Sequence, residues 1–226
     1  MASWMIHLRI ADRLLDELPG LSPAEFIVGN MAPDSGVPNA DWSSFTPSTK
    51  VSHFRTDDGT DKKEIDLEAY LKKYFTPTLR VGYDQKQDSF YLGYYVHLLT
   101  DCLWSDNIVM PCRVRFAEER AADRNAWIWR MKADWYDLDF KYLRDHPDFR
   151  AFRIYQAAAG FSNTYMEEFS PDAFDNRREY ITGFYLQEKD NLDREYKYLT
   201  GAETDRFVEE STARIRKHLE MMHGFV

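Results

Sequence analysis

Apolar residues recur every three or four positions along most of the chain, and this spacing predicts helices. The first amphipathic stretch covers about residues 4–18 and ends at Pro19-Gly20. Ser22-Pro23-Ala24-Glu25 has the composition of a helix start, and the short helix after it should stop at Pro33-Asp34-Ser35-Gly36. Further helices are predicted at about 67–75, 87–106, 113–144, 148–159, 171–189 and 203–222.

The sequence contains no persuasive strand pattern, and no linker divides it into two domains. We therefore predict a single all-α domain over residues 1–226, built as a bundle of about seven or eight helices. Pro111 should break the chain between two helices, and His146 before Pro147 should act as a cap or linker residue.

The segment 37–66 has no periodicity and is rich in polar residues, glycine and proline. Loops of this length inside a compact domain are usually functional. His53 lies within it between apolar residues, whereas the acidic stretch 57–61 does not complete a calcium loop and is expected to be a solvated tip.

The segment 90–104 is too apolar for a surface helix, yet it contains His97 and Asp101. Residues four positions apart lie on the same face of a helix. A buried imidazole and a buried carboxylate are costly unless they are paired or bound to a metal ion. The pattern alone leaves two interpretations open, an internal hydrogen bond or half of a metal site.

Three more residues of metal-binding types lie near apolar residues in the first half of the chain: His7, Asp34 and His53. Taken singly, His7 could be a core histidine and Asp34 a turn residue. Imidazole and carboxylate groups are suitable ligands for zinc and related divalent ions. Three histidines and two aspartates suffice for one complete site, or for two that share a carboxylate. His218 and His223 are spaced poorly for a shared ligand face and are assigned to the surface.

Composition and charge limit the partners and the cellular compartment that we expect. The chain has 29 Lys and Arg against 38 Asp and Glu, a net charge of -9 that argues against nucleic acid or an anionic membrane as a general partner. Cys102 and Cys112 are too few for a disulfide framework and are expected to be buried thiols. We see no signal peptide and no membrane span, so we expect a cytoplasmic protein without stable membrane insertion.

The order of the motifs resembles the zinc-dependent phospholipase C family, whose all-α fold is shared with the S1/P1 nucleases. The resemblance covers about residues 1–106, and its most specific parts are the Ala-Pro-Asp and Gly-x-x-x-His-x-x-x-Asp segments. The segments that carry it are Trp4 to His7, Gly29-Asn30-Met31-Ala32-Pro33-Asp34, Ser52-His53-Phe54, and Tyr91 to Asp101.

The resemblance implies specific roles for these residues. Asp34, His53, His97 and Asp101 would hold one zinc ion, and His7 with a bridging Asp101 would hold a second. Asp34 would also orient or deprotonate the attacking water. The family's third zinc uses two further histidines and a glutamate, one of these histidines four positions from the glutamate, and this pattern is missing after Asp101. Replacement carboxylates could come from Asp134 with Asp137 or Asp139, although a solvated helix face explains these residues as well.

We therefore expect a metal-dependent phosphoester hydrolase with one or two Zn²⁺ ions, with Mn²⁺ or another divalent ion as an alternative. The substrate would be a small phosphodiester or phosphomonoester, or a lipid headgroup. Arg55 and Tyr94 or Tyr95 are candidate substrate contacts. The alternative is a non-catalytic helical interaction protein that is stabilised by the same metal ligands.

Overall fold

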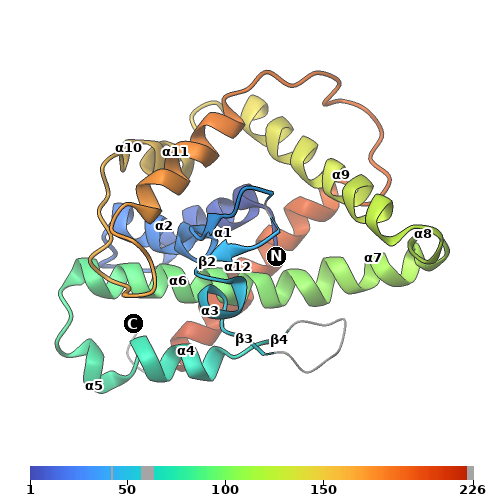
Figure 1. Cartoon of the computed structure of the whole chain (residues 1–226). Coiled ribbons are helices and arrows are strands. Elements are labelled where there is room, and N and C mark those ends of the chain that lie inside the picture. Colours follow the sequence, from blue (N-terminus) through green and yellow to red (C-terminus); the bar gives the residue numbers. More distant parts are fainter. Residues whose placement is uncertain (42, 57–63, 223–226) are drawn as a thin grey trace.

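The computed structural model describes residues 1–41, 43–56 and 64–222. The predicted acidic tip at 57–61 and His223 lie outside these residues. Helices dominate the described part, which confirms the all-α fold (Figure 1). The helices are α1 (Trp4–Glu17), α2 (Pro23–Met31), α3 (Thr49–Ser52), α4 (Leu67–Tyr74), α5 (Pro77–Arg80), α6 (Gln85–Trp104), α7 (Met110–Arg115), α8 (Ala117–Ala122), α9 (Arg124–Asp145), α10 (Arg150–Ala157), α11 (Ala173–Tyr185) and α12 (Gly201–Met221).

Helix α6 is the central element. Every residue from Ser89 to Asp101 is buried, as the apolar composition of this stretch predicts. α2 packs along it most extensively, and α1, α4 and α12 also contact it. In Figure 1, α9 and α11 lie on one side of α6, and α4 and α5 lie on the other. Within the described part of the chain, each helix is too short or too polar to cross a membrane.

Two glycines allow α2 and α6 to approach closely. A Cβ atom on Gly29 would lie 2.1 Å from the carbonyl oxygen of Phe90, and one on Gly93 would lie 2.1 Å from that of Phe26. Because both distances are far below van der Waals contact, no other residue fits at either position without moving a helix. Tight contact between these two helices brings the end of α2 beside the middle of α6.

The structure differs from the sequence prediction after α6. Pro111 does not break the chain: α6 continues through a π-helical turn (Ser105–Val109) into α7, where Pro111 lies in the first turn. The π-helical turn ends with the Met110 amide donating to the carbonyl oxygen of Ser105, five residues earlier, and a wider turn of this kind accommodates the proline that follows. The helix predicted over 113–144 is instead divided into α7, α8 and α9.

The segment 37–66 contains short strands that the sequence did not indicate. β1 (Val37–Pro38) pairs with β2 (Phe45–Thr46), and β3 (Arg55–Thr56) pairs with β4 (Glu64–Ile65), each pair antiparallel. Strands of two residues are too short to show an alternating pattern. Together with α3, the ladders hold His53 beside the core, where its side chain is buried.

Candidate metal centre

Four separate elements bring the five predicted ligand residues together. His7 lies on α1, Asp34 ends a 3₁₀ turn after α2 (Ala32–Asp34), His53 caps α3, and His97 and Asp101 lie one turn apart on α6. Potential ligand atoms lie within 4.8 Å of one another in two overlapping groups. One group contains His7, His97 and Asp101, and the other contains Asp34, His53 and His97.

The distances identify which atoms face each other. His53 Nε2 lies 3.2 Å from Asp34 Oδ1 and 3.3 Å from His97 Nε2. His7 Nε2 lies 3.4 Å from Asp101 Oδ1, and Asp101 Oδ2 is 3.8 Å from Nε2 of both His97 and His53. Nitrogen and oxygen atoms from all five residues thus surround one small region.

The simpler interpretation of His97 and Asp101 as a hydrogen-bonded pair does not describe this arrangement. Their separation of 3.8 Å is too long for a hydrogen bond. His97 Nδ1 instead lies 2.7 Å from the carbonyl oxygen of Asn30, and because a carbonyl can only accept, this nitrogen carries the proton. The Nε2 atom of neutral His97 therefore directs a lone pair toward the cluster, as metal-binding histidines do.

Unsatisfied buried atoms provide the test of whether a cation fits. Both ring nitrogens of His7, and Asp101 Oδ2, are buried without a hydrogen-bond partner. The rings of His7 and His97 stack in parallel, with centroids 3.7 Å apart, so they do not satisfy each other. Buried polar atoms normally have partners, and a nitrogen and oxygen donor set of this kind fits a divalent ion.

The protonation states agree with this donor set. Burial and the neighbouring His7 lower the pKa of His97 to about 3, which keeps the ring neutral. Burial opposes ionisation of Asp34, but the hydrogen bond with His53 and the surrounding imidazoles keep the pKa of this carboxyl well below its ordinary value. Neutral imidazole and ionised carboxylate are the forms that bind metal ions.

The first residues of the chain support the cluster in a way that the sequence did not reveal. The backbone nitrogen of Ala2 donates to Asp101 Oδ1 at 2.7 Å, and Trp4 Nε1 donates to Asp34 Oδ2 at 2.9 Å. Between them, Ser3 Oγ donates to Asp139 Oδ1 at 2.8 Å. The sequence does not predict the contact between Trp4 and Asp34, because the two residues are thirty positions apart and no spacing rule relates them.

The remaining candidate residues have other contacts. Asp134 and Asp137 both pair with Arg194, at 2.8 and 2.7 Å, and neither belongs to a ligand group among the described residues. Asp139 accepts hydrogen bonds from Ser3 and from Tyr185. The structure therefore does not bring these three carboxylates to the cluster.

The candidate substrate contacts also differ from expectation. Tyr94 is fully buried and donates to the carbonyl oxygen of Ser52, so it supports the segment that carries His53. Tyr95 is buried and its hydroxyl lies 2.9 Å from His218 Nε2, so this histidine is half-buried against α6 rather than a surface residue. Arg55 is half-buried in β3, two residues after His53.

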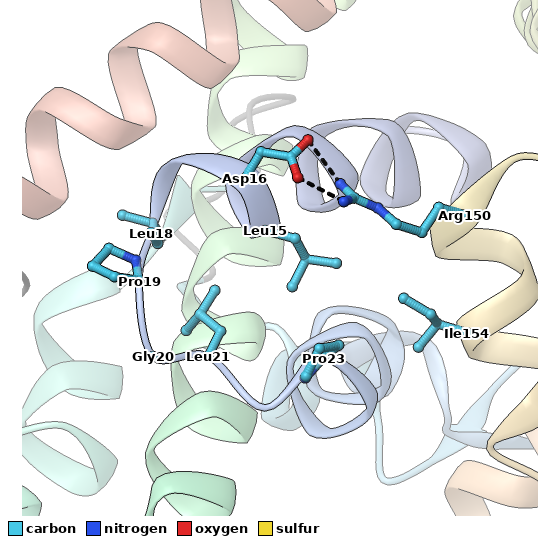
Figure 2. Close-up of a pocket in the computed structure, with 9 residues that line it drawn as sticks. All are labelled: Leu15, Asp16, Leu18, Pro19, Gly20, Leu21, Pro23, Arg150 and Ile154. Atoms are coloured by element: carbon cyan, nitrogen blue, oxygen red, sulfur yellow. Dashed lines mark hydrogen bonds and ion pairs between the residues drawn. The ribbon is translucent and has the colours of Figure 1, made fainter.

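A separate cavity of about 300 Å³ lies between the end of α1, the start of α2, and α10. Figure 2 shows Arg150 paired with Asp16 at its edge, beside the apolar side chains of Leu15 and Ile154. Leu15 is eight residues after His7, about 12 Å along the helix. Since its charged residues pair with each other and none of the five clustered residues lines it, this cavity is not the candidate metal centre.

Comparison with known proteins agrees with the geometry. The profile of the family described as zinc dependent phospholipase C matches residues 6–104. No curated protein and no solved structure matches the chain. The matched segment includes all five clustered residues, and it ends where α6 ends. Residues 6–104 therefore resemble the zinc-dependent phospholipase C family, as their motifs indicate.

Proposed function

We propose that the chain is a phosphoesterase that uses a divalent metal ion, with zinc as the expected ion. The observation that carries this proposal is the convergence of five buried ligand-type side chains that leave His7 and Asp101 atoms unsatisfied. The match of residues 6–104 to the zinc-dependent phospholipase C family supports the same reaction class. Helices α10 and α12 pack against α1, so we propose that residues 1–226 act as one domain.

We propose that Asp34, His53, His97 and Asp101 hold one ion, and that His7 and Asp101 hold a second. His97 can serve one ion only, because its Nδ1 donates to Asn30. Asp101 can bridge, since Oδ1 faces His7 while Oδ2 faces both His53 and His97. Mn²⁺ or another divalent ion is an alternative occupant of the same donor set.

Asp34 is our candidate for the general base. When bound, a divalent ion in such a site polarises the phosphoryl group and makes water more acidic. The Asp34 carboxylate remains ionised, and its two oxygens are oriented by different partners, Oδ1 by His53 and Oδ2 by Trp4. An ionised and oriented carboxylate can accept a proton from water during its attack on phosphorus.

A small phosphodiester, a phosphomonoester and a lipid headgroup are each compatible with a metal-dependent phosphoesterase of this family. A cytoplasmic location remains our expectation from the sequence. The rival proposal is a helical interaction protein in which the same residues bind metal for stability alone, and hydrolysis decides between them.

The decisive experiment combines elemental analysis with hydrolysis of bis-p-nitrophenyl phosphate in the presence of zinc or manganese. We expect His7→Ala to lose about one ion per chain and Asp101→Asn to weaken both sites. Asp34→Asn should lose turnover yet retain some metal, because an amide cannot take the proton. The matched control is His146→Ala, whose ring lies at the exposed end of α9.

Two results would contradict the proposal. A wild-type protein that carries metal but hydrolyses no phosphoester with either ion would favour the non-catalytic alternative. If His7→Ala has the metal content and the rate of the wild type, the second ion does not exist, and His7 is a core histidine.

A further inference from the structure

The candidate metal centre has one side that solvent can reach. His7 and His97 are fully buried, whereas the Asp34 side chain retains 8% of its exposure. Trp4, which donates to Asp34, is also only partly buried. A substrate must therefore approach from the side of Asp34 and Trp4.

Aromatic side chains from α1, α9 and α11 surround this side, and we call them the aromatic wall: Trp4, Tyr136, Tyr180 and Phe184. The ring of Trp4 packs edge-on against Tyr180 and Phe184, with centroids 6.0 and 5.7 Å apart. Tyr136 contacts Phe184 at 5.7 Å. All four residues of the wall lie outside residues 6–104, the segment that matches the family, so its chemistry is particular to the rest of this chain.

Arg177 of α11 lies beside the aromatic wall. It is buried to more than nine-tenths, and its guanidinium carbon is 5.4 Å from the centroid of the Tyr180 ring. Its Nη2 donates to the carbonyl oxygen of Gly36 at 2.6 Å, two residues after Asp34. In the described part of the chain no carboxylate pairs with Arg177, although a buried arginine normally has an anionic partner.

Lys132 of α9 is a second cation on the same side. It lies one turn before Tyr136, on the same face of the helix. It is half-buried, with Nζ 5.4 Å from the Trp129 ring, and it too has no carboxylate partner among the described residues. Burial lowers the pKa of Lys132, while the charge of Asp34 opposes this shift, which is consistent with a position facing the metal centre.

These two cations change the substrate that the aromatic wall would select. Aromatic rings alone would suit a quaternary ammonium headgroup through cation–π contacts. Lys132 and Arg177 would repel such a group, and their unused donors are suited to a carboxylate or phosphate. The net charge of the chain is -9, so two cations without a carboxylate partner among the described residues are not a consequence of overall composition.

On the basis of the proposed phosphoesterase function, we propose that Lys132 and Arg177 form a subsite for a second anionic group of the substrate, beyond the phosphoryl group that reacts. The preferred substrate is then a phosphoester whose alcohol portion carries a negative charge. Esters with a cationic headgroup are disfavoured.

The test measures binding of three phosphonates to the purified metal-loaded protein by calorimetry. 3-Phosphonopropionate, propylphosphonate and 2-aminoethylphosphonate share the phosphonate and carry an anionic, an uncharged and a cationic substituent. None can be hydrolysed, so the readout is binding alone. We expect 3-phosphonopropionate to bind at least about tenfold more tightly than 2-aminoethylphosphonate, the size of one charge-assisted hydrogen bond.

Variants then assign this preference to the two cations. Lys132→Gln and Arg177→Gln should each reduce the ratio of the two affinities by about tenfold. Lys141→Gln on α9 and Arg178→Gln on α11 are matched controls, since both cations already pair with aspartates, and they should preserve the ratio. If Arg177→Gln does not fold because it loses the Gly36 contact, Lys132→Gln decides alone.

The results separate the subsite from the proposed reaction. A wild-type ratio near one, or equal weakening of all three ligands in the variants, overturns the subsite even if bis-p-nitrophenyl phosphate is hydrolysed. A wild-type ratio of about ten or more that falls about tenfold in Lys132→Gln supports the subsite even if no ester is hydrolysed. In that case only the phosphoesterase proposal fails.

Discussion

Gly93 of α6 lies against Phe26 of α2 so closely that a Cβ atom on Gly93 would stand 2.1 Å from the Phe26 carbonyl oxygen. This contact sets the position of the metal centre as well as the packing of the helices. α2 leads directly to Asp34, and the next turn of α6 carries His97, whose Nδ1 hydrogen-bonds to Asn30 at the end of α2. Any change in the spacing of the two helices must therefore move one set of ligand residues relative to the other.

We expect Gly93→Ala to lower the free energy of unfolding by about 3 kcal/mol, because the methyl group meets backbone that cannot rotate away. Bound metal should fall in the same variant. The control is Gly183→Ala in α11, where nothing lies within 4 Å of the added atom, and alanine should stabilise the helix by up to about 1 kcal/mol. Urea denaturation measures both, and equal midpoints for Gly93→Ala and the wild type would refute the argument.

The second prediction concerns the hydrogen bond from Trp4 to Asp34. Trp4→Phe keeps an aromatic ring against α11 but removes the only indole donor to Asp34 Oδ2 that the described structure shows. We expect the hydrolysis rate to fall about tenfold, the size of one hydrogen bond to a charged group, while metal content and melting temperature stay close to the wild type. A variant with unchanged rate would show that this bond does not position Asp34.

Much of the fold could be predicted because helical periodicity is a local property. The limits of α1 and α4 agree with the prediction to within a residue or so, and the apolar stretch around His97 is the buried centre of α6. Pro111 was wrongly predicted to end a helix, because the π-helical turn that accommodates it has no sequence pattern of its own. The short strands beside His53 are only two residues long, so the sequence shows no alternation of apolar and polar residues there.

The candidate site likewise contains residues that the sequence indicates and residues that it does not. His97 and Asp101 stand out because polar residues interrupt an apolar helix. His7, Asp34 and His53 are residues of metal-binding types near apolar residues, and the resemblance of their motifs assigns them to one site. Lys132 and Arg177 were not identified, since each is an ordinary cation on a charged helix until its neighbours are known. Asp134 could not be assigned from sequence either, because its partner Arg194 lies in a distant irregular segment.

The third prediction compares His97 with His218. His97→Ala should remove bound metal and abolish hydrolysis, although Asp101 keeps its hydrogen bond from the Ala2 amide. His218→Ala removes a hydrogen bond from Tyr95 and should cost about 1 kcal/mol of stability, but it should not change metal content. Elemental analysis of both variants measures this, and loss of metal in His218→Ala would mean that the centre lies elsewhere.

The fourth prediction concerns removal of the ion. A ligand that binds only the folded state stabilises it in proportion to the logarithm of its concentration over its dissociation constant. Because the ligand residues come from α1, α3, α6 and the turn after α2, the ion would link four elements. Chelation should lower the melting temperature, and added zinc or manganese should restore it. An unchanged melting curve in protein proved free of metal would exclude a stabilising role.

The fifth prediction concerns Asp139, which is buried on α9 beside Ser3 and Tyr185. Burial raises its pKa from 3.8 to about 7, and the hydrogen bonds from Tyr185 and Ser3 only partly oppose this. Between about pH 4 and 7 the folded state therefore binds a proton that the unfolded chain has released. Its contribution to stability is complete below pH 4 and is lost as pH rises through 7.

Asp139→Asn cannot ionise, so it should escape this loss. From pH 5 to about 7, the free energy of unfolding of the wild type should fall relative to that of Asp139→Asn. The slope should be at most about 1.4 kcal/mol per pH unit. Urea denaturation at constant metal concentration measures it. Asp145→Asn, an exposed neighbour on α9 whose pKa is lowered by Arg144, is the control and should show no such shift. A flat difference for Asp139→Asn would mean that Asp139 remains ionised in the folded protein.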